Sequence, residues 1–414
     1  MTDIVEIETV GARGDGVAEA GALFVPGTLP GERVRIARHG QRGQVLEVLS
    51  PSLERIEPVC RHFGRCGGCS LQHASPAFLA DWKRGLVAAA LAARGFGDVE
   101  IRPTIAVPAA SRRRITVTAR RTKKATAIGF HMAGSETIVD LQECPVARPA
   151  LAAAVPRLAE LVGALASRKG ELRITLTDSA AGVDCAVEGA RPLDGPAQAL
   201  MAGIATRAGL VRIGVDGEAV VTRAAPVQPI GRASVLPPPG AFMQPTAEGE
   251  AAMLAAVRAA LEVPGGQARR VLDLFAGVGT FTLPLAEGAE VVAFEIEAAA
   301  LAALDRGWRE AAGQGLQRVA THARNLFHRP LAGPELKGAE AVVIDPPRAG
   351  AREQATQLAA SPVPVIASVS CNPATFARDA RILVEGGYRL DWVQPIDQFL
   401  WSGHVELVAR LSRP

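Results

Sequence analysis

The sequence predicts a multidomain chain made of a small β-barrel over residues 1–55, an α+β unit over 56–235 and an α/β unit over 236–414. At 414 residues the chain is longer than one ordinary hydrophobic core requires. Short alternating strands fill the first 55 residues, whereas apolar strands alternate with helices in the last third, as in a parallel sheet. The proline run 236–240 is typical of a linker between the last two units.

Composition and charge exclude several classes of protein. No apolar run is long enough to span a membrane, and Asp3 and Glu6 stand where a secretory signal needs basic residues. We therefore expect a cytoplasmic protein without a membrane span. The net charge of +3 does not by itself indicate a nucleic-acid partner. One acid-free segment offers a local positive field that suits phosphates, although a solvated strand face is an equal alternative; its basic residues are Arg112, Arg113, Arg114, Arg120, Arg121, Lys123 and Lys124.

The first 55 residues carry the turn chemistry of a small antiparallel barrel. Alternating runs such as 5–8, 33–36 and 43–48 are separated by turns that contain Gly27, Pro30 and Gly31. Barrels of this size often hold single-stranded nucleic acid, but others only connect domains. The sequence here predicts the fold more firmly than the function.

Three cysteines, Cys60, Cys66 and Cys69, share one glycine-rich turn, and Cys144 can complete a four-thiolate site by folding back. Zinc sites usually pair two C-x-x-C knuckles, and only one is present, so the spacing favours an iron-sulfur cluster over zinc, with unligated cysteines as a third interpretation. A [4Fe-4S] cluster with four cysteine ligands has no vacant iron site, which argues against a radical enzyme. Cys185 has no partner at metal-site spacing and is expected in the core.

The C-terminal third opens with a buried strand, 271–275, and a turn that contains Gly277 and Gly279. Thr282 stands where a dinucleotide fingerprint needs a third glycine, so that signature is incomplete. A second strand ends in Glu295, at the distance where ribose hydroxyls are bound. Because the turn has no Lys or Arg, a ligand with ribose and adenine but no phosphate fits best, and S-adenosylmethionine is such a ligand. A turn without any ligand is the alternative.

Two neighbouring strands, 341–344 and 366–370, end in Asp345 and Cys371, and a third tip near 321–325 places Asn325 within reach of an adenine edge. Ligands of open α/β sheets bind beyond the carboxyl ends of the strands, so a thiol and a carboxylate at neighbouring tips are candidate chemistry, although a lone cysteine is more often a core residue. Glu406 has apolar neighbours on both sides. Burial would raise its pKa and make it a base near neutrality, unless it is an exposed strand-start residue.

Several motifs together resemble those of the RNA uracil-5-methyltransferases, and the resemblance covers nearly the whole chain. They are Cys-x5-Cys-Gly-Gly-Cys from Cys60, the run from Asp273 to Ala286, Asp-Pro-Pro-Arg-Ala-Gly from Asp345, Ser-Cys-Asn-Pro from Ser370 and His-Val-Glu from His404. The N-terminal barrel is similar to that family's RNA-binding TRAM domain. The resemblance implies a Rossmann-like methyltransferase domain over 236–414 that acts on RNA.

Carried over position by position, the resemblance implies the site residues. Those that would line the S-adenosylmethionine pocket are Gln244, Phe275, Thr280, Glu295, Asn325 and Asp345. Cys371 would be the nucleophile and Glu406 the base. The four cysteines at 60, 66, 69 and 144 match the [4Fe-4S] ligands of the family's ribosomal RNA branch.

The chain departs from the family pattern at Thr246, where Asn is usual, and at Trp401-Ser402-Gly403, where a proline often stands. We expect a monomer that methylates carbon 5 of a uridine, in 23S ribosomal RNA rather than transfer RNA, with the cluster as a structural brace. One rival is an amino-group methyltransferase, but Arg348 stands where its Asp-Pro-Pro motif needs an aromatic residue. Another is a non-catalytic iron-sulfur RNA-binding protein, which would not bind S-adenosylmethionine.

Overall fold

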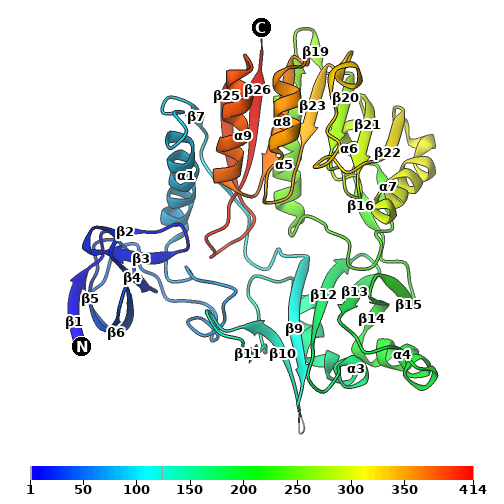
Figure 1. Ribbon diagram of the computed structural model, residues 1–414. Coiled ribbons are helices and arrows are strands. Elements are labelled where there is room, and N and C mark those ends of the chain that lie inside the picture. Colours follow the sequence, from blue (N-terminus) through cyan, green and yellow to red (C-terminus); the bar gives the residue numbers. More distant parts are fainter. Residues whose placement is uncertain (1, 123–124, 414) are drawn as a thin grey trace.

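A computed structural model describes residues 2–122 and 125–413, which form three large sheets with apolar cores and two short two-stranded hairpins (Figure 1). The N-terminal sheet has six strands in the order β1-β5-β6-β4-β3-β2. In β5, Val34 and Ile36 point into the core whereas Arg33 and Arg35 are exposed, so the alternating sequence pattern is the pattern of burial. The strands are β1 (Thr2–Glu6), β2 (Thr9–Val10), β3 (Asp15–Ala18), β4 (Leu23–Pro26), β5 (Arg33–His39) and β6 (Arg42–Ser50).

The central sheet has seven strands in the order β11-β10-β9-β12-β13-β14-β15, and three helices pack on it. Its core includes Cys185, which is fully buried, as the sequence predicted. The elements are β9 (Arg114–Arg121), β10 (Thr126–His131), β11 (Ile138–Asp140), α2 (Pro149–Ala154), α3 (Ala159–Leu165), β12 (Glu171–Ser179), β13 (Gly182–Glu188), α4 (Gly195–Ala208), β14 (Leu210–Val215) and β15 (Glu218–Thr222).

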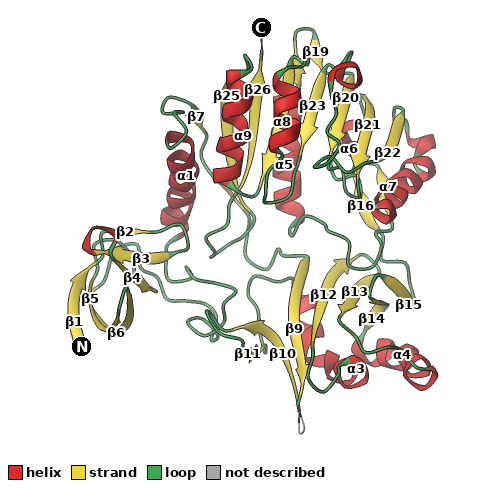
Figure 2. Cartoon of the chain, viewed as in Figure 1, coloured by secondary structure: helices red, strands yellow, loops and turns green. Residues whose placement is uncertain are grey.

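The C-terminal sheet is mixed, with the order β22-β21-β20-β23-β24-β26-β25-β7 and helices on its faces (Figure 2). Only β26 runs antiparallel to its neighbours β24 and β25. The strand order reverses between β20 and β23, and ligands of such sheets bind beyond the strand ends at that point. The elements are α5 (Ala247–Ala260), β18 (Glu262–Val263), β19 (Gly266–Gln267), β20 (Arg270–Leu274), α6 (Thr282–Leu285), β21 (Glu290–Glu295), α7 (Ala298–Glu310), β22 (Val319–Ala323), β23 (Ala341–Ile344), α8 (Arg352–Ala359), β24 (Val365–Ser370), α9 (Pro373–Glu385), β25 (Arg389–Asp397) and β26 (Glu406–Ser412).

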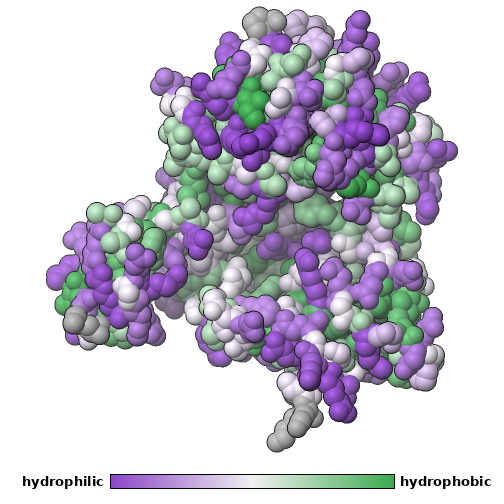
Figure 3. Space-filling view, viewed as in Figure 1, coloured by the Kyte–Doolittle hydropathy of each residue, from purple (hydrophilic) through white to green (hydrophobic). Residues whose placement is uncertain are grey.

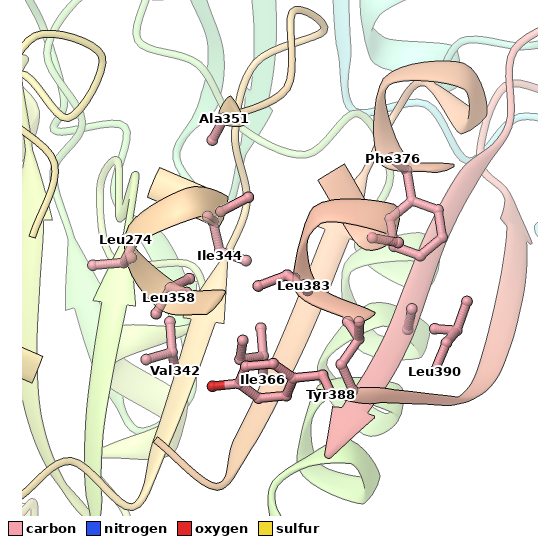
Figure 4. Close-up of a cluster of buried hydrophobic side chains, with 14 of the residues drawn as sticks. Leu274, Val342, Ile344, Ala351, Leu358, Ile366, Phe376, Leu383, Tyr388 and Leu390 are labelled. Atoms are coloured by element: carbon pink, nitrogen blue, oxygen red, sulfur yellow. The ribbon is translucent and has the colours of Figure 1, made fainter. Parts of the chain in front are cut away.

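One apolar layer fixes the strand ends that carry the candidate site. Val342 and Ile366 of the sheet pack with Leu358 of α8 and Leu383 of α9, all nearly inaccessible to water (Figure 4). The Tyr388 hydroxyl, at the edge of this layer, donates to the carbonyl of Val363 at 2.6 Å. Close packing of this kind leaves the strand tips little freedom to move.

The division of the chain in space differs from the ranges the sequence suggested. Helix α1 (Pro76–Ala92) packs against α9, and β7 (Glu100–Ile101) and β8 (Ile105–Ala106) pair with β25 of the C-terminal sheet. The hairpin of β16 (Gln228–Ile230) and β17 (Ala233–Val235) packs on α7. The range 56–235 therefore contains segments that pack on the third sheet, because an isolated hydrophobic helix or hairpin must bury its apolar face against the nearest core.

The proline run is not a free linker. Arg212 Nη1 donates to the carbonyl of Pro237 at 2.8 Å, and Pro239 packs so closely on Gly214 that a Cβ there would lie 2.3 Å from it. The run is therefore fixed to the central sheet rather than spanning solvent.

The basic segment is not one phosphate-binding face. Arg113 is buried and pairs with Glu250, and its Nε donates to the carbonyl of Gln244 at 3.1 Å. Arg120 pairs with Glu171. Lys123 and Lys124 lie outside the described residues. Over residues 2–122 and 125–413, no helix is long and apolar enough to cross a membrane.

Candidate active site

The antiparallel pairing of β24 with β26 brings Cys371 and Glu406 together. Ser370, the last residue of β24, pairs with Leu407, so the next residue of one strand and the preceding residue of the other meet at the same sheet edge. Asn372, two residues after the end of β24, caps α9, since its Oδ1 accepts the amide of Ala374 at 3.1 Å. The thiol therefore sits between a strand tip and a helix N-terminus.

Opposing influences act on the thiol of Cys371, which is partly exposed. Burial raises its pKa to about 11, and the nearby carboxylates of Glu406 and Asp345 add to this, whereas Arg348 lowers it. The N-terminus of α9 also favours an anion at this position. The Cys371 thiol therefore ionises most readily when the carboxyls of Glu406 and Asp345 are protonated and uncharged.

Glu406 is only 6% exposed, as its apolar neighbours predicted. Burial raises its pKa to about 7, against a lowering by the side chain of Gln398 and by Arg348. A carboxyl with this pKa exchanges a proton readily at neutral pH, which suits a general base.

Asp345 and Gln244 meet beside these two residues. The Gln244 Nε2 lies 3.5 Å from Asp345 Oδ2, and the backbone amide of Asp345 donates to the carbonyl of Leu274 at 3.2 Å. Burial raises the pKa of Asp345 well above its usual value, and the charge of Glu406 raises it further. Two predicted pocket residues are thus brought together from segments 101 residues apart.

The glycine turn after β20 has a strained backbone. Phe275 has φ of +66°, a conformation that costs energy for a side chain with a Cβ, and its amide and that of Ala276 both donate to the carbonyl of Phe294 at 3.0 Å. Gly279, at φ +97°, lies so close to Leu283 and Leu304 that only glycine fits. Thr280, which follows it, is partly exposed.

Glu295 and Asn325 lie at the tips of the next two strands. The Glu295 carboxylate accepts the amides of Gly277, Ile296 and Glu297 at 2.9, 2.6 and 2.8 Å, so it binds the glycine turn directly. The Asn325 side-chain oxygen accepts the amides of Phe327 and His328, at 3.0 and 3.3 Å. That oxygen is occupied by a turn, so only the amide nitrogen of Asn325 is left to meet a ligand.

A cavity of about 520 Å³ opens over Cys371. Arg348 and His404 line it from the C-terminal part, Arg13 from the N-terminal part and Leu86 from α1. In Figure 3 the surface is hollowed where the three parts of the molecule meet. The cavity gives the thiol access from outside, and its two arginines supply positive charge.

The four predicted cluster ligands, Cys60, Cys66, Cys69 and Cys144, line one separate cavity and form no disulfide. Among the described residues, however, no group of three or more His, Cys, Asp or Glu side chains is arranged to hold a single metal ion. Three features of this cavity suit an anionic cluster held by thiolates. It is lined by four thiols, the Gly68 amide donates to the Cys66 sulfur at 3.4 Å, and the buried Arg112 Nε has no hydrogen-bond partner among the described residues.

Both departures from the family pattern have structural roles. Thr246 caps α5, since its hydroxyl accepts the amide of Gly249 at 3.0 Å. The carbonyl of Trp401 accepts the amides of Ser70 and Leu71 at 2.9 and 3.1 Å, which ties this loop to the cysteine turn.

The sequence reasoning missed Gln398, Lys83 and Arg13. Lys83 is fully buried and its Nζ bonds Asp397 and the carbonyl of Phe399. The sequence offered two signals for these residues. Lys83 lies among the apolar residues of α1, and the polar pair Asp397-Gln398 comes at the end of an apolar strand. Neither identifies its partner without the tertiary structure.

Comparison with known proteins places this site in context. The family model described as tRNA (Uracil-5-)-methyltransferase matches residues 165–413. An uncharacterised RNA methyltransferase of Brucella suis is 46% identical over 100% of this chain and 98% of that protein. The 23S rRNA (uracil(1939)-C(5))-methyltransferase RlmD of Alkalilimnicola ehrlichii is 34% identical over 99% of this chain and 96% of that protein.

Among solved structures, the fold is similar to that of the Pyrococcus abyssi tRNA (uracil-54, C5)-methyltransferase in complex with S-adenosyl-L-homocysteine. The TM-score is 0.76 with 25% identity, over 99% of each chain. The similarity covers all three parts of the molecule rather than the C-terminal sheet alone.

Proposed function

We propose a mechanism and a target for this chain, which belongs to the tRNA (uracil-5-)-methyltransferase family and is an S-adenosylmethionine-dependent RNA uracil-5-methyltransferase. The observation that carries the mechanism is the adjacency of Cys371 and Glu406 at one sheet edge beneath an accessible cavity.

Cys371 is the nucleophile. Carbon 5 of uracil is too weak a nucleophile to take a methyl group directly, so the thiolate first adds to carbon 6 and forms an S–C6 bond. The electron pair of the C5–C6 double bond moves onto carbon 5 and the carbonyl, as an enolate. S-adenosylmethionine would supply an electrophilic methyl group: the C5–CH3 bond forms as the sulfonium S–CH3 bond breaks, and neutral S-adenosylhomocysteine leaves with the electron pair of that bond.

Glu406 is the base that completes the reaction. Its carboxylate removes the proton from carbon 5, the double bond reforms and the S–C6 bond breaks, so the thiolate is recovered and one proton is gained by Glu406. A pKa of about 7 allows this proton to be taken and released at neutral pH. Burial among apolar strands is therefore part of the function of Glu406.

The S-adenosylmethionine pocket lies over the glycine turn. We assign it to Phe275, Thr280, Glu295 and Asn325 at the tips of β20 to β22, with Gln244 and Asp345 between this pocket and the thiol. Carboxylate oxygens of Glu295 that already hold the turn retain lone pairs for ribose hydroxyls.

The target is a uridine in RNA that must leave its stack to reach the cavity. We favour 23S ribosomal RNA, because the relative that acts on 23S rRNA is 34% identical while the structurally similar transfer RNA enzyme is 25% identical. The four-cysteine cavity supports the same choice, with a [4Fe-4S] cluster as a brace. Transfer RNA is the second candidate. The N-terminal sheet, which places Arg13 on the cavity, serves as a TRAM-type RNA-binding part.

Cys371→Ser tests the mechanism. We expect no methyl transfer and no covalent protein–RNA band on a denaturing gel, because a serine hydroxyl ionises far less readily than a thiol. Glu406→Gln should instead accumulate the covalent band, since the adduct forms but does not resolve. Methylation at the wild-type rate in either variant would refute the role assigned to that residue.

Mapping 5-methyluridine by mass spectrometry identifies the target. RNA from cells that lack the protein should lose this modification at one uridine of 23S rRNA. Loss in transfer RNA alone would refute the preferred target and leave the chemistry intact.

A further inference from the structure

A buried glutamine stands directly behind the proposed base. Gln398 is 1% exposed and directly follows the last residue of β25. Within β25, Ile396 pairs with Glu406. This register places Gln398 two residues beyond the partner of Glu406, on the same side of the sheet, and its amide lowers the pKa of that carboxyl. Its Nε2 also donates to Gln244 Oε1 at 2.9 Å.

The contacts of Gln398 form a chain from the base to the S-adenosylmethionine pocket. Gln244, which accepts from Gln398, has its own amide nitrogen 3.5 Å from Asp345 Oδ2. Two amides thus lie between the buried carboxyl of Glu406 and the carboxyl of the partly exposed Asp345. The four residues come from four separate segments: β26, the end of β25, the loop before α5 and the end of β23. This row of contacts therefore exists only in the folded protein.

The surrounding structure holds Gln398 in one place. A Cβ at Gly249 of α5 would lie 2.7 Å from Gln398 Oε1, so the glycine leaves the room that the side chain occupies. On its other side, Asp397 is anchored by the buried Lys83, and the amide of Phe399 donates to Asp397 Oδ1 at 3.1 Å. This degree of fixation indicates a positioning role rather than simple filling of space.

We propose that Gln398 is a positioning residue for the base: it orients Glu406 toward carbon 5 and bonds it before and after proton uptake. The carboxylate accepts from the amide nitrogen. Gln398 Oε1 has no hydrogen-bond partner among the described residues, so it is free to accept the O–H of protonated Glu406 after rotation of the amide. The inference rests on the role of Glu406 proposed above.

Other charged groups also face Glu406, and the test must leave them unchanged. Arg348 and Asp345 approach from the end of β23, and Cys371 from the end of β24. On α5, which packs on β26, Glu250 is engaged by Arg113. A change confined to Gln398 preserves all of these charges.

Gln398→Met removes the amide and keeps the length of the side chain. On in vitro transcribed 23S rRNA in single turnover, we expect the covalent adduct to form but to decay about 10- to 100-fold more slowly at pH 7, the range expected for loss of one hydrogen bond to a charged group. The decay midpoint, which is the pH at which the adduct decays at half its maximal rate, should rise by on the order of one pH unit, because the Glu406 carboxylate has lost a hydrogen-bond donor. Gln398→Glu should raise this midpoint further by like-charge repulsion.

Gln394→Met is the matched control, since Gln394 is also buried on β25 but donates to the carbonyls of Pro103 and Pro395. Its decay midpoint should equal that of the wild type. Equal decay rates and midpoints in Gln398→Met and wild type, with unchanged S-adenosylmethionine affinity, would overturn the proposal.

A second measurement separates this inference from the proposed reaction. Carbon-13 NMR titration of the Glu406 carboxyl in the RNA-free protein, assigned with Glu406→Gln, needs no turnover. A higher pKa of Glu406 in Gln398→Met than in the wild type supports the positioning role. If the wild type forms no covalent adduct, the covalent mechanism alone is refuted, and this support for Gln398 is unaffected. The same pKa in both proteins overturns the inference.

Discussion

The cost of burying Glu406 predicts that removal of its charge stabilises the protein in a pH-dependent way. Burial raises the pKa of this carboxyl from 4.5 to about 7, which corresponds to roughly 3 kcal/mol at about 1.4 kcal/mol per pKa unit. Because the folded state binds the proton more tightly than the unfolded chain, the wild type loses stability as pH rises from 4.5 to 7. Glu406→Gln cannot ionise and escapes this loss.

The assay is thermal unfolding of wild type and Glu406→Gln at pH 5 and pH 8. We expect the advantage of the variant to grow by about 2 to 3 kcal/mol between the two pH values, or roughly 5–10 °C in Tm for a domain of this size. Glu310→Gln, at an exposed position on α7, is the control, and its Tm difference from wild type should not grow. A Glu406→Gln difference that is the same at pH 5 and pH 8 would refute the argument that burial tunes this base.

Three further predictions concern the structure around the site. Lys83→Met should lower the free energy of unfolding by about 3–5 kcal/mol by leaving Asp397 buried without its partner, and Lys83→Met/Asp397→Leu should recover much of this in urea unfolding; no recovery would contradict the pairing. Gly403→Ala places a Cβ 2.7 Å from the Ala12 carbonyl and should weaken RNA binding in filter assays by about 5- to 100-fold, as expected for overpacking of 1–3 kcal/mol, while S-adenosylmethionine binding is retained. Cys66→Ser should abolish bound iron and sulfide in the anaerobically purified protein; undiminished iron would remove Cys66 from the ligand set.

Local sequence patterns determined much of this protein. The run 341–344 is apolar throughout, and 366–370 is apolar except for Ser368 and Ser370. Both runs are followed by a proline that ends the strand, so their burial and the position of Asp345 and Cys371 at strand tips are readable without a structure. The apolar residues on either side of Glu406 likewise predicted its burial, and the motifs indicated the family.

The tertiary structure alone decided which of these pieces meet. Strand β26 inserts antiparallel between β24 and β25, and this insertion places Glu406 beside Cys371 and Gln398 behind Glu406. Helix α1 and strands β7 and β8 join the same sheet although the sequence grouped them with the central part. Periodicity encodes which side of a strand is buried, but strand order depends on how all the apolar faces are covered at once, and that is a property of the whole chain.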